Sequence, residues 1–274
     1  MRGKAKINHL IVHLILLAGT IIVVFPFLWM ILTSFKTNGE AMQIPPTILP
    51  TEWVTDSYQE ILTAIPFATV YMNTIISAVV TTAVQVAFCA MAAYAFARIE
   101  FPFKNIIFVL LLSVLMVPGQ IFLIPQYLIV QKLGLLDTLP ALMLPNLFSA
   151  FGTFLLRQFF MSLPKELEEA AVLDGCSRYQ IFGKIMLPLV KPTVVTVIVL
   201  GINGAWNDLM WPLIVTSNTS MRTLTNGLAM FVDSSLQYGT AFAGAFISIC
   251  PMLVLYIFGQ RYFVEGTATS GLKG

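Results

Sequence analysis

The sequence SLPKELEEAAVLDGCSRYQIFGKIMLP occupies residues 162–188, where the charged residues of this chain are most concentrated. Ser162 is of a type that caps helix N-termini, and the proline and three acids that follow it suit a first helical turn. Gly175 suits the left-handed conformation that ends a helix. Ser177 and Gln180 have the spacing of a capping box, which starts a second helix. We therefore predict a helix-turn-helix with its turn at Gly175.

The first predicted helix has a shallow face, because Leu163, Leu167, Ala170 and Ala171 share one side of it. The alanines allow another surface to approach closely. Helices that lie on membranes prefer basic polar faces and bulky apolar anchors, whereas this helix is acidic. Helix physics alone leaves two interpretations open, a surface that docks another protein and a passive loop.

The chain as a whole is strongly apolar, with 58% hydrophobic residues, 10% charged residues and a mean hydropathy of +0.86. Soluble domains carry about 25% charged residues. The 15 Lys and Arg residues nearly balance the 13 Asp and Glu residues, so no polyanionic partner is indicated. This composition excludes a water-soluble enzyme, a disordered regulator and a nucleic-acid binder.

Long uncharged stretches lie on both sides of residues 162–188, and a bilayer core needs about 20 apolar residues of helix. The first stretch exceeds the apolar core of a signal peptide and lacks a cleavage site, so we expect it to remain as an anchor. We predict an all-α membrane protein, a single transmembrane domain over residues 1–274, with the helix-turn-helix between spans four and five. The six spans are expected at 11–32, 70–96, 106–129, 139–159, 190–212 and 242–262.

Basic residues set the orientation, because Lys and Arg are retained in the cytoplasm during insertion. With both termini inside, twelve basic residues are cytoplasmic and three are external. The external ones are Lys36, Lys132 and Arg222; the cytoplasmic ones are Arg2, Lys4, Lys6, Arg98, Lys104, Arg157, Lys165, Arg178, Lys184, Lys191, Arg261 and Lys273. Residues 162–188 are therefore expected in the cytoplasm.

Neither a metal site nor a disulfide scaffold is expected. The three cysteines, Cys89, Cys176 and Cys250, are far apart in the sequence and form no CxxC pair. His9 and His13 fall one turn apart, but no third ligand accompanies them.

One motif in residues 162–188 is highly specific. Glu169-Ala170-Ala171, Gly175, Ile185 and Leu187-Pro188 stand at the spacing of the EAA signature, so the chain resembles the permease subunits of ABC importers. More narrowly, it resembles the second permease of carbohydrate importers of the maltose type, over nearly its whole length. Supporting segments are SFK at 34–36, AYAFAR at 93–98, FLLRQF at 154–159, WND at 206–208, WPL at 211–213 and QRYFVEG at 260–266.

The resemblance implies that the EAA loop sits in a groove of a cytoplasmic ATPase and transmits its movement to the spans. It implies that Glu169 pairs with a basic residue of the ATPase, that Ala170 and Ala171 pack in its groove, and that Asp174 and Gly175 shape the turn. It also implies a second homologous permease, two ATPases and an extracytoplasmic solute-binding protein. The chain lacks a GxxxxGK[ST] loop, so no cofactor is expected on it and ATP is expected to be used by its partners.

Polar residues within spans are candidates for the solute path, because they are costly in hydrocarbon. The densest group is Asn203, Trp206, Asn207 and Asp208. These residues could contact sugar directly, or they could serve helix packing, capping or gating. Others that stand out are Asn73, Gln85, Gln120, Gln126, Gln131 and Asn146.

We therefore expect a non-enzymatic permease subunit of a bacterial or archaeal cytoplasmic membrane, which moves a sugar or sugar-like solute inward by alternating access. An ion-coupled secondary transporter is the alternative, but only Asp208 could serve as its buried ionisable group. An intramembrane enzyme is a weaker alternative, because no HExxH motif or nucleophile and base pair is present.

Overall fold

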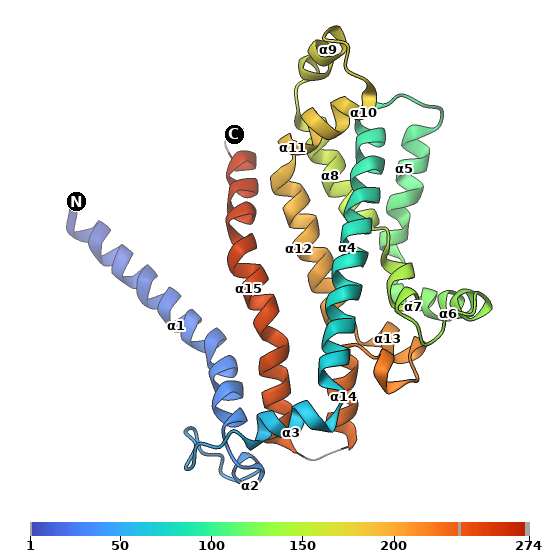
Figure 1. The fold of residues 1–274 in the computed structure, drawn as a ribbon. Coiled ribbons are helices and arrows are strands. Elements are labelled where there is room, and N and C mark those ends of the chain that lie inside the picture. Colours follow the sequence, from blue (N-terminus) through green and yellow to red (C-terminus); the bar gives the residue numbers. More distant parts are fainter. Residues whose placement is uncertain (1, 235–236, 272–274) are drawn as a thin grey trace. The chain divides into compact units, whose positions relative to one another are not determined.

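A computed structural model describes the backbone of residues 2–234 and 237–271, and the side chains of 11–233 and 237–260. Every regular element in these described ranges is helical, as predicted for an all-α protein (Figure 1). The chain divides into two compact units, which are described separately. The first comprises residues 1–67 with 227–251, and the second comprises residues 68–226 with 252–274.

The first unit contains α1 (Arg2–Ser34), α2 (Asn38–Ala41), α3 (Asp56–Ala64) and the first part of α15 (Tyr238–Gly271). The Ser34 hydroxyl lies 2.7 Å from the Tyr58 hydroxyl, which ties the end of α1 to α3. The Thr240 hydroxyl donates to Oε2 of Glu60 at 2.6 Å and ties α15 to the same helix. Polar pairs thus join the helix ends of this unit.

Lys36 and Glu40 organise the loop that follows α1. Nζ of Lys36 donates to the carbonyl of Thr47 and lies 4.9 Å from the centre of the Trp29 ring. The Glu40 carboxylate accepts hydrogen bonds from the Thr47 hydroxyl at 2.8 Å and from the amide and hydroxyl of Thr51 at 2.9 and 3.0 Å. Burial raises the pKa of Glu40, but these hydrogen bonds and the charge of Lys36 outweigh it and lower the pKa below its ordinary value.

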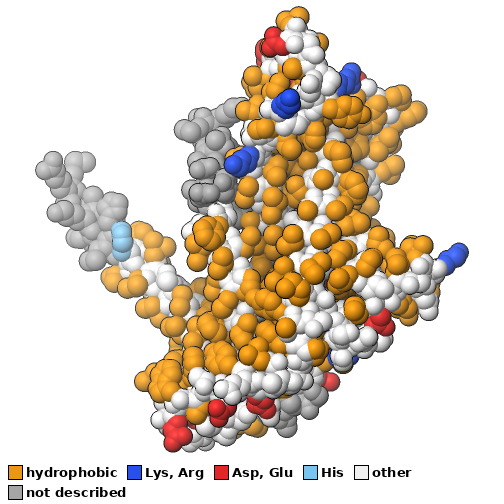
Figure 2. Space-filling view, in the orientation of Figure 1, with side chains coloured by type: hydrophobic (Ala, Val, Ile, Leu, Met, Phe, Trp, Pro, Cys, Tyr) orange, Lys and Arg blue, Asp and Glu red, His pale blue; other side chains and the backbone are white. Residues whose placement is uncertain are grey.

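The second unit is built on α4, a helix of 32 residues (Phe67–Arg98). The elements that follow it are α5 (Lys104–Ser113), η1 (Val114–Met116), η2 (Gly119–Phe122), α6 (Leu123–Lys132), α7 (Leu139–Met143), η3 (Leu144–Asn146), α8 (Ala150–Ser162), α9 (Glu166–Leu173), α10 (Arg178–Gln180), the π-helical η4 (Ile181–Met186), α11 (Leu187–Leu189), α12 (Lys191–Asn207), α13 (Met210–Val215), η5 (Thr219–Met221) and the start of α14 (Leu224–Ser234). Figure 2 shows hydrophobic side chains over most of this unit, with charged ones at its α9 end and a few others near α6 and α13.

Three helices in the described ranges are each long and apolar enough to cross a membrane: Ile11–Ser34, Phe67–Arg98 and Tyr238–Gln260. They correspond to the predicted spans 11–32, 70–96 and 242–262. The last two residues of the 242–262 span have backbones but no described side chains.

The other three predicted spans, 106–129, 139–159 and 190–212, each contain a break and are not single straight helices. The first two are bent pairs, Lys104–Met116 with Gly119–Lys132 at 99° and Leu139–Asn146 with Ala150–Ser162 at 48°. The third is interrupted between α12, which ends at Asn207, and α13, which begins at Met210. A third bent pair joins the second helix of the helix-turn-helix to α12, Arg178–Leu189 with Lys191–Asn207 at 80°. The described part of the chain reaches six candidate spans only if each bent pair counts as one.

A proline and two polar caps lie at the breaks within the spans 106–129, 139–159 and 190–212. Pro118 lacks an amide proton and favours an extended residue before it, and Val117 accordingly leaves the helix with ψ 125°. Ser149 caps the second half of the next pair, where its hydroxyl accepts from the Gly152 amide at 3.0 Å. Asp208 has ψ 117° and ends α12, and its carboxylate accepts from the Trp211 amide at 3.3 Å in the first turn of α13.

The core of the second unit joins α9 to the ends of α4 and α8. Ala171 is buried, and so are Tyr94 of α4 and Phe160 of α8. The rings of Tyr94 and Phe160 meet edge to face at 5.7 Å, and Phe182 lies 5.2 Å from Tyr94. The helix-turn-helix is therefore packed onto the bundle and does not hang from it as a free loop.

Candidate functional sites in the helix-turn-helix and a polar cavity

The turn between α9 and α10 has the predicted local structure. Gly175 has φ +79°, and the amide of Cys176 donates to the carbonyl of Ala171 at 3.0 Å across the helix end. The Ser177 amide donates to Oε1 of Gln180 at 2.8 Å, and the Gln180 amide donates to the Ser177 hydroxyl at 3.4 Å. This capping box starts the second helix as expected.

The start of the first helix was predicted wrongly. Ser162 does not cap it, because Ser162 is the last residue of α8 and its hydroxyl donates back to the carbonyl of Phe159 at 2.8 Å. Pro164 also precedes the helix, and α9 begins at Glu166. The apolar pattern of α8 continues through Phe160, which is buried. Tertiary packing therefore extends α8 to Ser162, the residue that was predicted to cap the next helix.

The predicted coupling residues divide between two sides of the helix-turn-helix. Glu169, Ala170, Asp174 and Gly175 are exposed, whereas Ala171 is 4% exposed and packs inside this subunit. Ala171 therefore holds α9 against the bundle, and its side chain is turned away from the open face.

Two large apolar side chains at the turn went unnoticed in the sequence. Leu173 is 88% exposed and Tyr179 is 89% exposed, one on each side of Gly175. Large exposed apolar and aromatic side chains are typical of partner-binding surfaces. Their position, directly beside the glycine that ends α9, is the sequence signal that could have identified them.

A cavity of about 370 Å³, with several polar side chains in a largely apolar wall, lies within the second unit among α4, η3, α8 and α12. Nε2 of Gln85 donates to the carbonyl of Asn146 at 2.7 Å on one wall. Gly201 allows α12 to approach α4, because a Cβ there would lie 3.0 Å from Oε1 of Gln85. The lining consists of Thr81, Gln85, Asn146, Ser149, Phe151, Gly152, Val197, Leu200, Gly201, Gly204, Ala205 and Asp208.

Of the four predicted solute-path residues, only Asp208 lines this cavity. Asn203 and Asn207 are exposed on α12, where Nδ2 of Asn207 donates to the carbonyl and the side-chain oxygen of Asn203 at 2.9 and 3.1 Å. Trp206 is buried, and its ring meets Tyr71 edge to face at 5.9 Å. The four residues therefore lie in three different environments and do not form one site.

The side chain of Asn73, another polar candidate, has a structural partner. Its Nδ2 donates to the carbonyls of Ser220 and Arg222 at 2.8 and 3.1 Å. As to metals, no group of three His, Cys, Asp or Glu side chains that could hold an ion occurs among the described residues. The side chain of His9 lies outside that described set.

These features define an integral membrane component with an exposed helix-turn-helix. Residues 85–264 match the family described as the inner membrane component of binding-protein-dependent transport systems. The chain belongs to this family. It is a permease component of an ABC importer and not an enzyme.

Curated permease proteins are similar to this chain over almost its whole length. The arabinooligosaccharides transport system permease protein AraQ of Halalkalibacterium halodurans is 37% identical over 257 residues, which cover 92% of each chain. The sn-glycerol-3-phosphate transport system permease protein UgpE of Brucella abortus is 30% identical over 97% of this chain and 98% of its own.

The fold matches a solved transporter. A chain in the crystal structure of a bacterial ABC transporter involved in the import of the acidic polysaccharide alginate superposes with a TM-score of 0.83. The match covers 94% of this chain and 97% of that chain at 23% identity, so it establishes the fold.

Proposed function

We propose that this chain is one of two permease subunits of an importer for a neutral sugar, and that α9 and its turn dock onto a cytoplasmic ATPase. The observation that carries the docking assignment is the pair of exposed apolar residues that flank the Gly175 turn, Leu173 at the end of the acidic helix α9 and Tyr179 in α10. Burying exposed apolar side chains on a partner is favourable, and charged residues at the rim set the orientation.

Each residue of the proposed docking surface has a distinct role. Leu173 and Tyr179 enter the groove of the ATPase, and Ala170 permits close contact beside them. Glu169 is exposed and available to a basic partner residue. Asp174 and Gly175 shape the turn, and Ala171 keeps α9 seated on its own bundle.

The topology proposed for the chain has six membrane crossings over residues 1–274, with both termini and the helix-turn-helix in the cytoplasm. The twelve-to-three distribution of basic residues supports this orientation. The terminal residues 1 and 272–274 lie outside the described structure. The complete importer would contain a second homologous permease, two ATPase subunits that bind the ATP, and an extracytoplasmic solute-binding protein.

The solute passage is assigned to the α12 side of the bundle. The cavity there presents amide, hydroxyl and carboxylate groups, which suit the hydroxyls of a sugar. Asn203 and Asn207 are exposed within a predicted span, and polar groups in that setting usually face a water-filled path or another helix. We place them on the passage or against the second permease, with Trp206 as packing behind them.

The charge of the cavity favours a neutral solute. Asp208 is the ionisable residue among its lining residues, and no Lys or Arg accompanies it. A lone carboxylate repels phosphorylated or acidic sugars and accepts hydrogen bonds from sugar hydroxyls. Among the relatives, this chemistry fits the arabinooligosaccharides named for AraQ better than the sn-glycerol-3-phosphate named for UgpE.

The function can be tested with the complex purified from its native membrane and reconstituted in vesicles. ATP should drive uptake of neutral oligosaccharides, with much slower uptake of sn-glycerol-3-phosphate or acidic oligosaccharides. Uptake driven by a proton gradient without ATP would instead support the secondary transporter. For docking, Leu173→Asp should remove the ATPase from the purified complex, whereas Leu173→Met should retain it; retention in both variants would refute the docking surface.

A further inference from the structure

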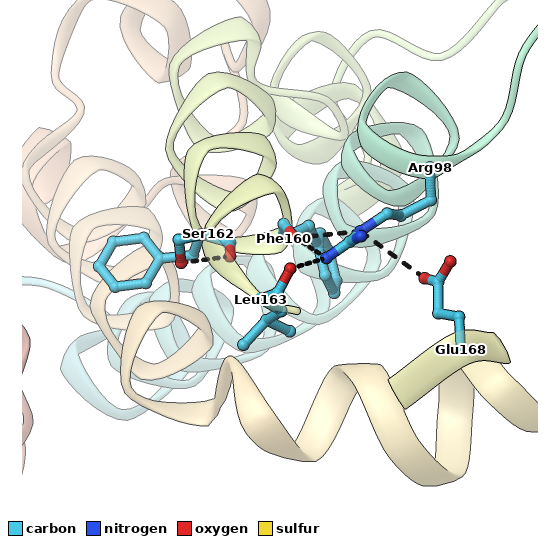
Figure 3. Close-up of polar contacts among 6 residues, drawn as sticks. Arg98, Phe160, Ser162, Leu163 and Glu168 are labelled. Atoms are coloured by element: carbon cyan, nitrogen blue, oxygen red, sulfur yellow. Dashed lines mark hydrogen bonds and ion pairs between the residues drawn. The ribbon is translucent and has the colours of Figure 1, made fainter. Parts of the chain in front are cut away.

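Two arginines lie in the AYAFAR and FLLRQF segments, which the docking and passage assignments leave without a role. Arg98 ends α4, and its guanidinium donates to α8: Nε to the carbonyl of Phe160 at 3.1 Å, and Nη2 to the carbonyls of Phe160 and Leu163 at 2.6 and 2.5 Å (Figure 3). These carbonyls belong to the last turn of α8 and its C-cap. A cation there satisfies free acceptors and interacts favourably with the helix dipole.

Arg157 makes the opposite connection, from α8 to α4. Its Nε donates to the carbonyl of Phe96, in the last turn of α4, at 3.2 Å. Its guanidinium also lies 4.1 Å from the centre of the Phe108 ring on α5. Each helix therefore sends an arginine to the C-terminal carbonyls of the other, and the two ends are joined twice.

Arg98 also faces α9. Its Nε lies 3.7 Å from Oε1 of Glu168, and the two side chains are only 5% and 20% exposed. This separation is that of an ion pair and exceeds a hydrogen bond. Among the described residues Oε1 of Glu168 has no hydrogen-bond partner and faces Arg98, while the Glu168 carboxylate also interacts with the hydroxyl of Tyr94 on α4.

The connection from α9 to the bundle thus has two parts of different character. Ala171 packs in an apolar cluster, which is non-directional. The Glu168 and Arg98 contact joins opposite charges in a place with little solvent, where separating them is unfavourable. Both parts resist displacement of α9 relative to the ends of α4 and α8, and the second adds a directional connection that depends on charge.

We propose that Glu168 and Arg98 form the link through which movement of α9 displaces α4 and α8, and that Arg157 makes these two helix ends move together. Glu168 and Arg98 are positioning residues that contact neither ATP nor solute. The proposal rests on the docking function of α9, since the displacement would come from the ATPase. It assigns transmission to this pair, whereas Glu169, Leu173 and Tyr179 serve attachment.

The central test is Glu168→Gln in the reconstituted importer, because glutamine keeps the size of the side chain and removes its charge. The ATPase subunits should co-purify at the wild-type level, and ATP hydrolysis should continue. The amount of solute transported per ATP should fall by about fivefold or more, the lower range of coupling between protein sites. Glu166→Gln is the matched control, because Glu166 is an exposed acid on the same helix. In this variant the amount of solute transported per ATP should stay at the wild-type value.

A double-mutant cycle tests whether the two residues act through each other. Arg98→Gln alone should also lower the ratio of transport to hydrolysis, and the double variant with Glu168→Gln should be no worse than the more impaired single variant. Melting temperatures of the three complexes report whether Arg98→Gln disturbs folding. If Arg98→Gln does disturb folding, the ratio of transport to hydrolysis in Glu168→Gln alone tests the proposal.

Two results would overturn the proposal. One is a wild-type ratio of transport to hydrolysis in Glu168→Gln. The other is loss of the ATPase subunits from that variant, which would make Glu168 an attachment residue. If the docking assignment itself is wrong, a different result is expected: the ATPase subunits should co-purify with the Leu173→Asp complex at the wild-type level.

Discussion

Ser177 and Gln180 cap each other's amides, with N···O distances of 2.8 Å to Oε1 of Gln180 and 3.4 Å to Oγ of Ser177. This pair starts α10 directly after the left-handed Gly175, so the turn is specified on both sides. The direction in which α9 projects its exposed Leu173 therefore depends on local geometry at three positions.

The first prediction concerns Gly175. Valine at φ +79° is strained by about 1–2 kcal/mol, so Gly175→Val should reorient α9 and reduce recovery of the ATPase with the purified complex. Gly175→Asn should be milder, because asparagine tolerates this conformation. Gly183→Ala serves as a control, since a Cβ there meets no atom within 4 Å. Equal ATPase recovery in Gly175→Val and wild type would show that the turn conformation is unimportant.

The second prediction concerns Asp208. Asp208→Asn keeps the shape of the cavity and removes its charge, so discrimination against acidic oligosaccharides should fall while uptake of neutral ones continues. Uptake of both solute classes by reconstituted vesicles measures the change. Asn207→Ala, outside the cavity, should alter the rate of transport without changing this discrimination. Unchanged selectivity in Asp208→Asn would remove the carboxylate from the solute path.

The third prediction concerns pH and the loop after α1. The pKa of Glu40 is lowered in the folded protein, so its stabilising charge is fully present above the pKa of the unfolded chain. That contribution is lost as the pH falls through the lower, folded value. Amide exchange in residues 42–53, corrected for its intrinsic pH dependence, should accelerate only in that acidic range.

Variants of two glutamates separate this effect from general acid unfolding. Glu40→Gln should accelerate amide exchange in the loop already at neutral pH, because the charged acceptor of the Thr47 and Thr51 hydrogen bonds is gone. Glu52→Gln, at an exposed position, should leave exchange unchanged. Identical behaviour of the two variants would contradict the role given to Glu40.

The fourth prediction concerns orientation. In a chain whose native cysteines are replaced, Lys165→Cys should resist an impermeant thiol reagent in intact cells and react in inside-out vesicles, because Lys165 is exposed and is among the basic residues expected in the cytoplasm. Lys132→Cys should show the reverse pattern, because Lys132 lies among the three basic residues expected outside. Labelling of Lys165→Cys in intact cells would contradict the proposed topology.

Features that depend on neighbouring residues could be predicted from the sequence. The capping box at Ser177, the left-handed Gly175 and the three long apolar helices involve interactions within a few residues, or simple length and hydropathy. The bend at Pro118 followed from a local rule that a count of uncharged residues ignored. The spacing of the EAA signature predicted the family of ABC importer permeases, and the family match over residues 85–264 confirms that prediction.

By itself, the sequence determined that this protein is helical and embedded in a membrane, because composition decides those properties. It also determined a helix-turn-helix with its turn at Gly175, because short-range hydrogen bonding decides that structure. The tertiary structure decided which side each residue faces. Ala171 turned inward and Leu173 outward, and Asp208 entered the cavity without Asn203 and Asn207. Arg98 bonds to carbonyls more than 60 residues away, and no local pattern indicates which distant helix end will lie within reach of a side chain.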